Sequence, residues 1–121
     1  MATIMLVDDS SVIRNRLLRN LSGTDFQVVA EARDGIEALD KYRLHNPDIV
    51  TMDLTMPQMN GLECIRRILQ LDPHAKILVV SAINDRRSAL QAISCGAKGF
   101  LCKPFTDEEL IEQLGEVSRA G

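Results

Sequence analysis

The chain has 121 residues, 45% of them hydrophobic and 26% charged, and carries 14 Lys+Arg against 17 Asp+Glu for a net charge of -3. This length fits one domain, 1–121, and the composition argues against a disordered chain. The net negative charge gives no overall attraction to nucleic acid or to an anionic membrane. With 3% aromatic residues and no Trp, the chain has few rings on which single-stranded bases could stack, which argues against such a platform too.

The cysteines indicate a reducing environment, and the amino terminus has no pattern of a secretion signal. Cys64, Cys95 and Cys102 form no CxxC pair, and an odd number cannot all close into disulfides. With only His45 and His74 beside them, there is no tetrahedral zinc pattern. The opening stretch MATIMLVDD lacks the basic start of a signal peptide and the length of a membrane span. These features predict a cytoplasmic protein that does not bind a membrane.

Short apolar runs recur along the chain, and most are apolar at successive positions rather than at every second one. This pattern is typical of parallel strands that helices cover on both faces. The expected strands are 3–8, 26–31, 48–53, 76–81 and 99–103.

Segments of helical period separate these runs, each long enough for about three turns. Three of them open with a cap residue followed by Glu three positions later, and the third is a strict capping box: Asp34 with Glu37, Asn60 with Glu63, and Thr106 with Glu109. Gly23 and Gly96 stand where helices should end. The periodic apolar positions are Ile13, Leu17 and Leu21; Ile36, Leu39 and Tyr42; Leu62, Ile65, Ile68 and Leu69; Leu90 and Ile93; and Leu110, Leu114 and Val117.

This alternation predicts an α/β fold, a doubly wound sheet of five parallel strands in the order 2-1-3-4-5 with helices on both faces. Right-handed crossovers between units of this length favour an open sheet over a closed barrel. Ligands of such sheets bind beyond the carboxyl ends of the strands where the strand order reverses. The site is therefore expected between the first and third strands.

Three acids are expected at that edge. Asp8 and Asp9 end the first strand and Asp53 ends the third. Two like charges about 4 Å apart repel by roughly 4 kcal/mol at an effective dielectric near 20, so such a group should bind protons or a cation. Oxygen ligands without His or Cys select Mg2+, or Mn2+, and Mg2+ sites commonly include phosphate oxygens. A lone Asp here would serve as a helix cap, and Asp9 is expected to share that role.

Two further residues end the neighbouring strands. Ser81 closes the fourth strand, and Lys103 closes the fifth, just before Pro104. A hydroxyl and an ammonium can both contact a phosphoryl group, although Ser81 can equally be a plain turn residue. The sequence does not determine whether the Lys103–Pro104 peptide bond is cis or trans. Beside Mg2+, the Asp53 carboxylate can act as a nucleophile toward phosphorus, with Lys103 stabilising the charge.

The combined motifs resemble a known family. The pairs Asp8-Asp9 and Ser81-Ala82, the stretch TMDLTMPQMNG around Asp53, and the stretches GAKGF and KPF near the carboxyl end are similar to the receiver domain of two-component response regulators. The resemblance covers essentially the whole chain, and it is closest to the stand-alone CheY-like chemotaxis regulators, which share the flavodoxin-like strand order 2-1-3-4-5.

The resemblance implies a role for each site residue. Asp53 is the expected phosphoacceptor, and Asp8, Asp9 and Asp53 are expected to bind Mg2+ with the backbone carbonyl of Thr55. Ser81 and Lys103 would contact the phosphoryl group. Ser81 and Phe100 would form the switch that alters the face of the fourth helix, fifth strand and fifth helix. Phe100 lacks the phenol hydroxyl that many chemotaxis members carry at this position.

The family also tunes the phosphoryl lifetime at two positions, which here are Thr55 and Ile83. An apolar Ile83 should exclude water or fail to orient it. We therefore expect self-dephosphorylation to be slow, and to be faster in Ile83→Glu or Thr55→Asn variants.

The resemblance also implies the partners. A histidine kinase is expected as phosphodonor and a downstream protein such as a flagellar motor switch component as target, with no direct nucleic-acid contact and a monomeric chain. The protein is not expected to be an enzyme beyond slow self-phosphorylation from small phosphodonors and self-dephosphorylation. An excised receiver of a longer regulator with a DNA-binding or enzymatic output domain is the main alternative.

Two other classes of protein fit the sequence less well. A haloacid dehalogenase-type phosphatase needs a second Asp two residues after its nucleophile, but positions 10 and 55 are Ser and Thr. A flavodoxin-like electron carrier needs a phosphate-binding loop after the first strand, where Asp-Asp-Ser-Ser would repel phosphate.

Overall fold

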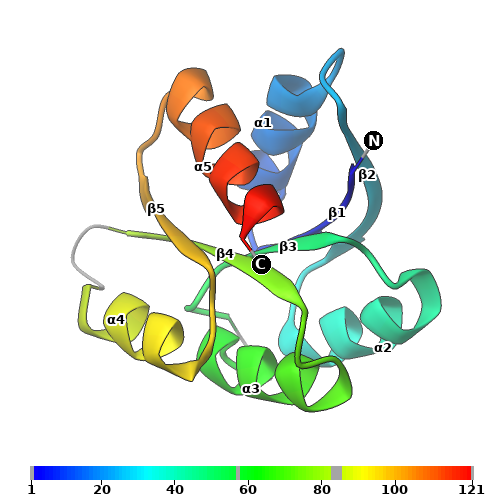
Figure 1. Ribbon diagram of the computed structural model, residues 1–121, viewed down its shortest axis with the longest axis vertical. Coiled ribbons are helices and arrows are strands. Elements are labelled where there is room, and N and C mark those ends of the chain that lie inside the picture. The colour runs from blue at the N-terminus through cyan, green and yellow to red at the C-terminus, as the bar shows by residue number, and fades with distance from the viewer. Residues whose placement is uncertain (1, 57, 83–85, 121) are drawn as a thin grey trace.

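The computed structural model describes residues 2–56, 58–82 and 86–120, and strands and helices alternate along them (Figure 1). The strands are β1 (Ala2–Val7), β2 (Phe26–Ala32), β3 (Ile49–Met52), β4 (Lys76–Ala82) and β5 (Gly99–Lys103). The helices are α1 (Ser11–Leu21), α2 (Gly35–His45), α3 (Gly61–Leu71), α4 (Arg86–Cys95) and α5 (Asp107–Arg119). Every expected strand is present, with ends that differ by no more than one residue from the prediction.

The strands form one parallel sheet in the order β2-β1-β3-β4-β5, which confirms the predicted topology. All four residues of β3 are buried, as are the last four of β1. These strands have no solvent-facing side there, which explains their unbroken apolar runs. The strand order reverses between β1 and β3, and this places a crevice at their carboxyl ends.

Two helix layers enclose the sheet. α1 and α5 lie on one side, and α2, α3 and α4 lie on the other (Figure 1). Each layer covers its own cluster of buried side chains. The first includes Leu17, Leu21, Leu110, Leu114 and Val117, and the second includes Leu39, Tyr42, Cys64, Ile65 and Ile68.

The helix ends follow the sequence signals closely. The side chains of the three predicted caps accept hydrogen bonds from the backbone N–H three residues later, and both bonds of the capping box are present at α5: Asp34 from Glu37, Asn60 from Glu63, and Thr106 from Glu109. Gly23 and Gly96, with φ of 80° and 123°, follow the ends of α1 and α4 as predicted. The cap of α1 differs, because Ser10 accepts from the N–H of Ile13 and Asp9 does not share this role.

The apolar positions of α4 do not face the core as the periodicity suggested. Leu90 and Ile93 are 63% and 41% exposed, whereas Ala89 and Ala92 are buried. The alanine face packs against the sheet, so the two larger side chains turn toward solvent. Ile36 at the start of α2 is likewise 50% exposed.

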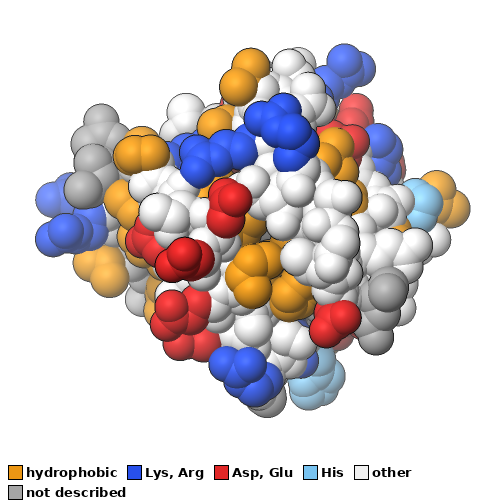
Figure 2. Space-filling model, turned by 90° about the horizontal axis from the view of Figure 1, so that it is seen from above, with side chains coloured by type: hydrophobic (Ala, Val, Ile, Leu, Met, Phe, Trp, Pro, Cys, Tyr) orange, Lys and Arg blue, Asp and Glu red, His pale blue; other side chains and the backbone are white. Residues whose placement is uncertain are grey.

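Three further observations concern the surface, the cysteines and the length of the helices. Lys and Arg, Asp and Glu, and apolar side chains are interspersed over the face above α1 and α5, so no continuous basic surface covers this face (Figure 2). Cys64, Cys95 and Cys102 are free thiols. Within the described ranges, no helix is long and apolar enough to cross a membrane.

Candidate phosphoryl and metal site

The candidate site lies where β1, β3 and β5 end. Val7 and Met52 are register partners, so Asp8 and Asp53 leave the sheet side by side. The N–H of Asp53 donates to the carbonyl of Val7 at 2.9 Å, and the N–H of Asp8 donates to that of Ala32 at 3.0 Å. Sheet hydrogen bonding therefore continues up to both acids and fixes their main chain.

The beginning of α3 packs directly against the main chain of Asp53. The N–H of Gly61 donates to the carbonyl of Leu54 at 3.0 Å. A Cβ at position 61 would lie 2.3 Å from the carbonyl oxygen of Asp53 and 2.6 Å from the Cα of Leu54. Only glycine permits this close approach of the helix to the site.

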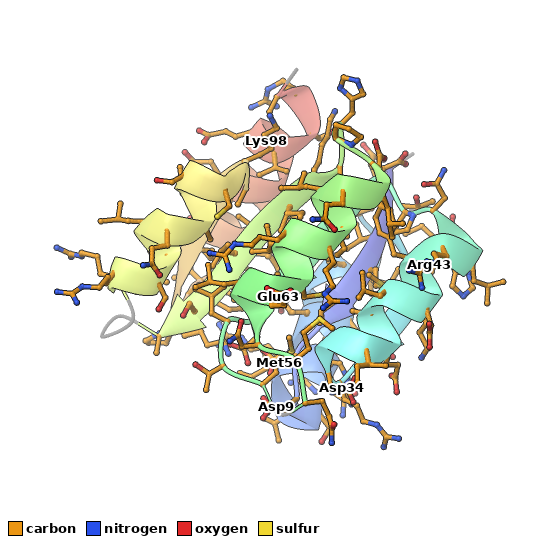
Figure 3. The ribbon with its side chains drawn as sticks, turned by 90° about the horizontal axis from the view of Figure 1, so that it is seen from below. Asp9, Asp34, Arg43, Met56, Glu63 and Lys98 are labelled. Carbon is orange, nitrogen blue, oxygen red and sulfur yellow. The ribbon has the colours of Figure 1, made fainter. Side chains whose placement is uncertain are left out.

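Three carboxylates meet at this edge. Asp8, Asp9 and Asp53 each offer an oxygen atom, and these atoms lie within 4.8 Å of one another. Asp8 and Asp53 are buried, with 2% and 7% exposure, whereas Asp9 is exposed. Asp9 and Met56 lie at the same end of the molecule, opposite Lys98 (Figure 3). The structure thus brings together the three acids that the sequence placed at two strand ends.

Lys103 extends from the end of β5 toward two of these acids. Its Nζ lies 3.0 Å from Oδ2 of Asp8 and 3.7 Å from Oδ1 of Asp53. The Lys103–Pro104 peptide bond is cis, the isomer that the sequence left open. One ammonium group therefore contacts carboxylates from β1 and β3.

The electrostatics of the site centre on Asp53. Burial raises the pKa of its carboxyl to about 6, from an ordinary value of 3.8, and the negative charge of Asp8 adds to this rise. The Lys103 ammonium and the N–H of Thr55 lower the pKa of the same carboxyl, and Asp9 raises it further. The lysine therefore compensates only part of the excess negative charge.

The donor set fits a divalent cation. The three acids offer only carboxylate oxygens, and neither Cys nor His belongs to the group. Mg2+ and Mn2+ prefer oxygen ligands of this kind. The raised pKa of Asp53 means that its ionised form is disfavoured in the site, and a bound cation would favour that form.

The other expected site residues within the described ranges lie on β4, on β5 and in the loop after β3. Ser81 is 1% exposed on β4 and is the register partner of Cys102 on β5. The N–H of Thr55 donates to Oδ1 of Asp53 at 3.4 Å. Phe100, on β5, is partly buried against the core beneath α2, α3 and α4. Ile83 lies outside the described residues.

The sequence matches the response regulator receiver domain over residues 4–115. This chain belongs to that family. It is 42% identical over 116 residues to the chemotaxis protein CheY of Thermotoga maritima, a match that covers 96% of this chain and 97% of the relative. It also resembles a CheY in the CheX-CheY-BeF3-Mg complex of Borrelia burgdorferi, with a TM-score of 0.91, 32% identity and coverage of 96% and 88% of the two chains.

This chain also matches part of a longer relative. The transcriptional regulatory protein DegU of Brevibacillus brevis is 34% identical over 119 residues, but the match covers 98% of this chain and 50% of DegU. Receivers are signalling proteins rather than conventional enzymes, and they bind Mg2+ at an acidic pocket. The family and the fold inferred from the sequence are confirmed.

Sequence reasoning missed Arg14 and Glu31. The guanidinium of Arg14 donates to the main-chain carbonyl of Asp8, and its Nε lies 3.1 Å from Oε1 of Glu31. The N–H of Ser10 also donates to Oδ1 of Asp8 at 2.9 Å. An arginine early in the helix that follows the acid pair was the only sequence signal, and it is a weak one because helix arginines commonly face solvent.

Proposed function

We propose that residues 1–121 form one receiver domain that a histidine kinase phosphorylates on Asp53 in a Mg2+-dependent reaction. The observation that carries this proposal is the placement of Asp53, which is buried, adjoins Asp8 and Asp9, and lies 3.7 Å from the Lys103 ammonium. A carboxylate with these neighbours combines a nucleophile with groups that stabilise negative charge.

The transfer step uses the ionised Asp53. One carboxylate oxygen attacks the phosphorus of phosphohistidine, forming an O–P bond as the P–N bond breaks and its electron pair returns to the imidazole. Lys103 is placed to pair with a phosphoryl oxygen, and Asp8 keeps the ammonium at the site through its 3.0 Å contact. Asp8, Asp9, Asp53 and the carbonyl of Thr55 would hold Mg2+, or Mn2+. When bound, the metal supplies positive charge that stabilises the phosphoryl oxygens.

The response to phosphorylation is assigned to Ser81 and Phe100. Ser81 lies on β4 beside β5, the strand that carries both Phe100 and Lys103. A shift of Ser81 toward the phosphoryl group would make room for the Phe100 ring and alter the face formed by α4, β5 and α5. This is a local charge event that changes packing at a distance.

Chemotaxis or motility is the setting that the relatives favour. In this role the receiver is a cytoplasmic monomer whose target is a protein such as a flagellar motor switch component. The match to half of DegU supports the second candidate, a receiver that belongs to a longer regulator with an output domain. Determining the complete reading frame that encodes this chain separates the two.

The phosphoacceptor is tested by intact-mass spectrometry after incubation with acetyl phosphate, with and without Mg2+. Wild type should gain the mass of one phosphoryl group only when Mg2+ is present, and Asp53→Ala should gain none. Asp40→Ala is the matched control, because its side chain is 73% exposed on α2. Phosphorylation of Asp53→Ala at the wild-type level would refute the assignment.

A further inference from the structure

Arg14 contacts two groups with one side chain. Its guanidinium donates to the main-chain carbonyl of Asp8, and its Nε donates to Oε1 of Glu31 at 3.1 Å. The side chain is only 17% exposed. Because the guanidinium is planar and its donors have a fixed arrangement, each of these contacts restricts the other.

Glu31 is in turn held from the opposite helix layer. Lys41 on α2 donates to the main-chain carbonyl of Glu31 at 2.6 Å. The next residue, Ala32, accepts from the N–H of Asp8 at 3.0 Å. α1 and α2 lie on different sides of the sheet (Figure 1), so the main chain of Glu31 is held from the side opposite Arg14.

The carbonyl that Arg14 contacts belongs to the peptide between the two acids Asp8 and Asp9. A peptide unit is planar, so holding this carbonyl restricts ψ of Asp8 and φ of Asp9 together. The Asp8 carboxylate has further support from Ser10 and Lys103. Asp9 is exposed, and its carboxylate depends more on the main chain for its direction.

We propose that Arg14, braced by Glu31, is a positioning residue for the divalent-cation site. It holds the Asp8–Asp9 peptide so that both carboxylates are directed toward the same ion. This inference rests on the proposed function, since it assumes that the acid group binds Mg2+. Arg14 itself contacts neither the ion nor the phosphoryl group in this role.

Removing Arg14 should change the affinity for Mg2+ in opposite directions, depending on whether the residue acts through its charge or by positioning the two acids. Arg14 is cationic and lies near a cation site, so through its charge alone it would weaken Mg2+ binding. Its removal would then tighten binding. If Arg14 positions the two acids, its removal weakens binding instead, and the sign of the change in affinity distinguishes the two effects.

The test measures Mg2+ binding to the whole chain by isothermal titration calorimetry at one pH and ionic strength. Arg14→Gln and Arg14→Lys should each weaken binding by about tenfold or more, because lysine keeps the charge but cannot make both contacts. Arg19→Gln on the exposed side of α1 is the matched control and should bind like wild type. Thermal unfolding without Mg2+ identifies any variant that has lost its fold.

A double-mutant cycle tests the brace. Glu31→Gln should weaken Mg2+ binding, and the double variant with Arg14→Gln should lose less affinity than the two single changes added together. Wild-type or tighter affinity in folded Arg14→Gln or Arg14→Lys would overturn the inference while leaving the proposed function intact. Absence of Mg2+ binding in wild type would overturn both.

Discussion

Replacing Asp53 by Asn should stabilise the metal-free protein at neutral pH, although it removes the proposed phosphoacceptor. Asn has nearly the same size and keeps an oxygen that can accept from the N–H of Thr55, a bond of 3.4 Å in the structure. The substitution removes a negative charge that is buried beside Asp8. The same residue would therefore be required for signalling and unfavourable for folding.

The magnitude follows from the pKa of Asp53, which is about 6 in the fold against an ordinary 3.8. Each pKa unit corresponds to about 1.4 kcal/mol, so the ionised carboxylate destabilises the fold by about 3 kcal/mol. The folded state binds this proton more tightly than the unfolded state. The free energy of unfolding of wild type therefore falls as pH rises from about 4 to about 6 and then stays at the lower level.

The assay is urea unfolding followed by circular dichroism in EDTA, over the range from about pH 4 to about pH 8. Asp53→Asn should exceed wild type by a margin that grows by about 2.4 kcal/mol across this range, because the carboxyl of the unfolded chain is already partly ionised at about pH 4. Asp40→Asn on exposed α2 should show no such growth. Saturating Mg2+ should then reduce the margin, because the ion binds folded wild type more tightly than the variant.

A margin that stays constant with pH would refute the reasoning about Asp53. So would a metal-free wild type that is more stable than Asp53→Asn at about pH 8. Either result would mean that the buried carboxylate is already compensated by its own neighbours.

Four other substitutions test three separate properties of the site. Lys103→Met removes an ammonium that lowers the pKa of Asp53, so this pKa should rise above about 6, seen by NMR of the carboxyl carbon, and labelling by acetyl phosphate should fall by about tenfold or more. Gly61→Ala should lower the free energy of unfolding by about 2 kcal/mol or more in urea titrations, because the new Cβ meets backbone atoms. Thr55→Asn and Ile83→Glu should each lose the phosphoryl group faster than wild type in time-resolved mass spectrometry.

Lys103→Met and Gly61→Ala each have a control variant. Lys98→Met changes an exposed lysine at the other end of the molecule and should leave the pKa of Asp53 unchanged (Figure 3). Gly23→Ala has no atom within 4 Å of the new Cβ and should cost only about 1 kcal/mol of backbone strain at its positive φ. Equal losses in Gly23→Ala and Gly61→Ala would contradict the packing argument. Unchanged phosphoryl lifetimes would contradict the idea that water is poorly oriented at the site.

Features set by neighbouring residues could be predicted from the sequence. The continuous apolar runs that end at Asp8 and Asp53 predicted the parallel sheet, because a strand covered on both faces has no alternation of polar and apolar residues. The cap residues Asn60 and Thr106 predicted where α3 and α5 begin, because their hydrogen-bond partners lie only three residues away in the sequence. The strand order then predicted that the acids and Lys103 lie at the same edge of the sheet.

Features that depend on tertiary distance could not be predicted in the same way. Arg14 and Glu31 are 17 residues apart, and their pairing depends on how α1 lies against the end of β2. The periodicity of α4 marked Leu90 and Ile93 for the core, because hydropathy ranks them above alanine. The sheet instead accepts Ala89 and Ala92, since small side chains allow the helix backbone to lie closer.

The alanine face of α4 has a consequence for how firmly this helix is held. Ala89 and Ala92 each bury a single methyl group, whereas α3 inserts the larger Ile65 and Ile68. Since adhesion grows with buried apolar area at roughly 25 cal/mol per Å2, α4 is the more easily displaced of the two helices. A tilt or slide of α4 thus requires little work, and its amide hydrogens should exchange with solvent sooner than those of α3.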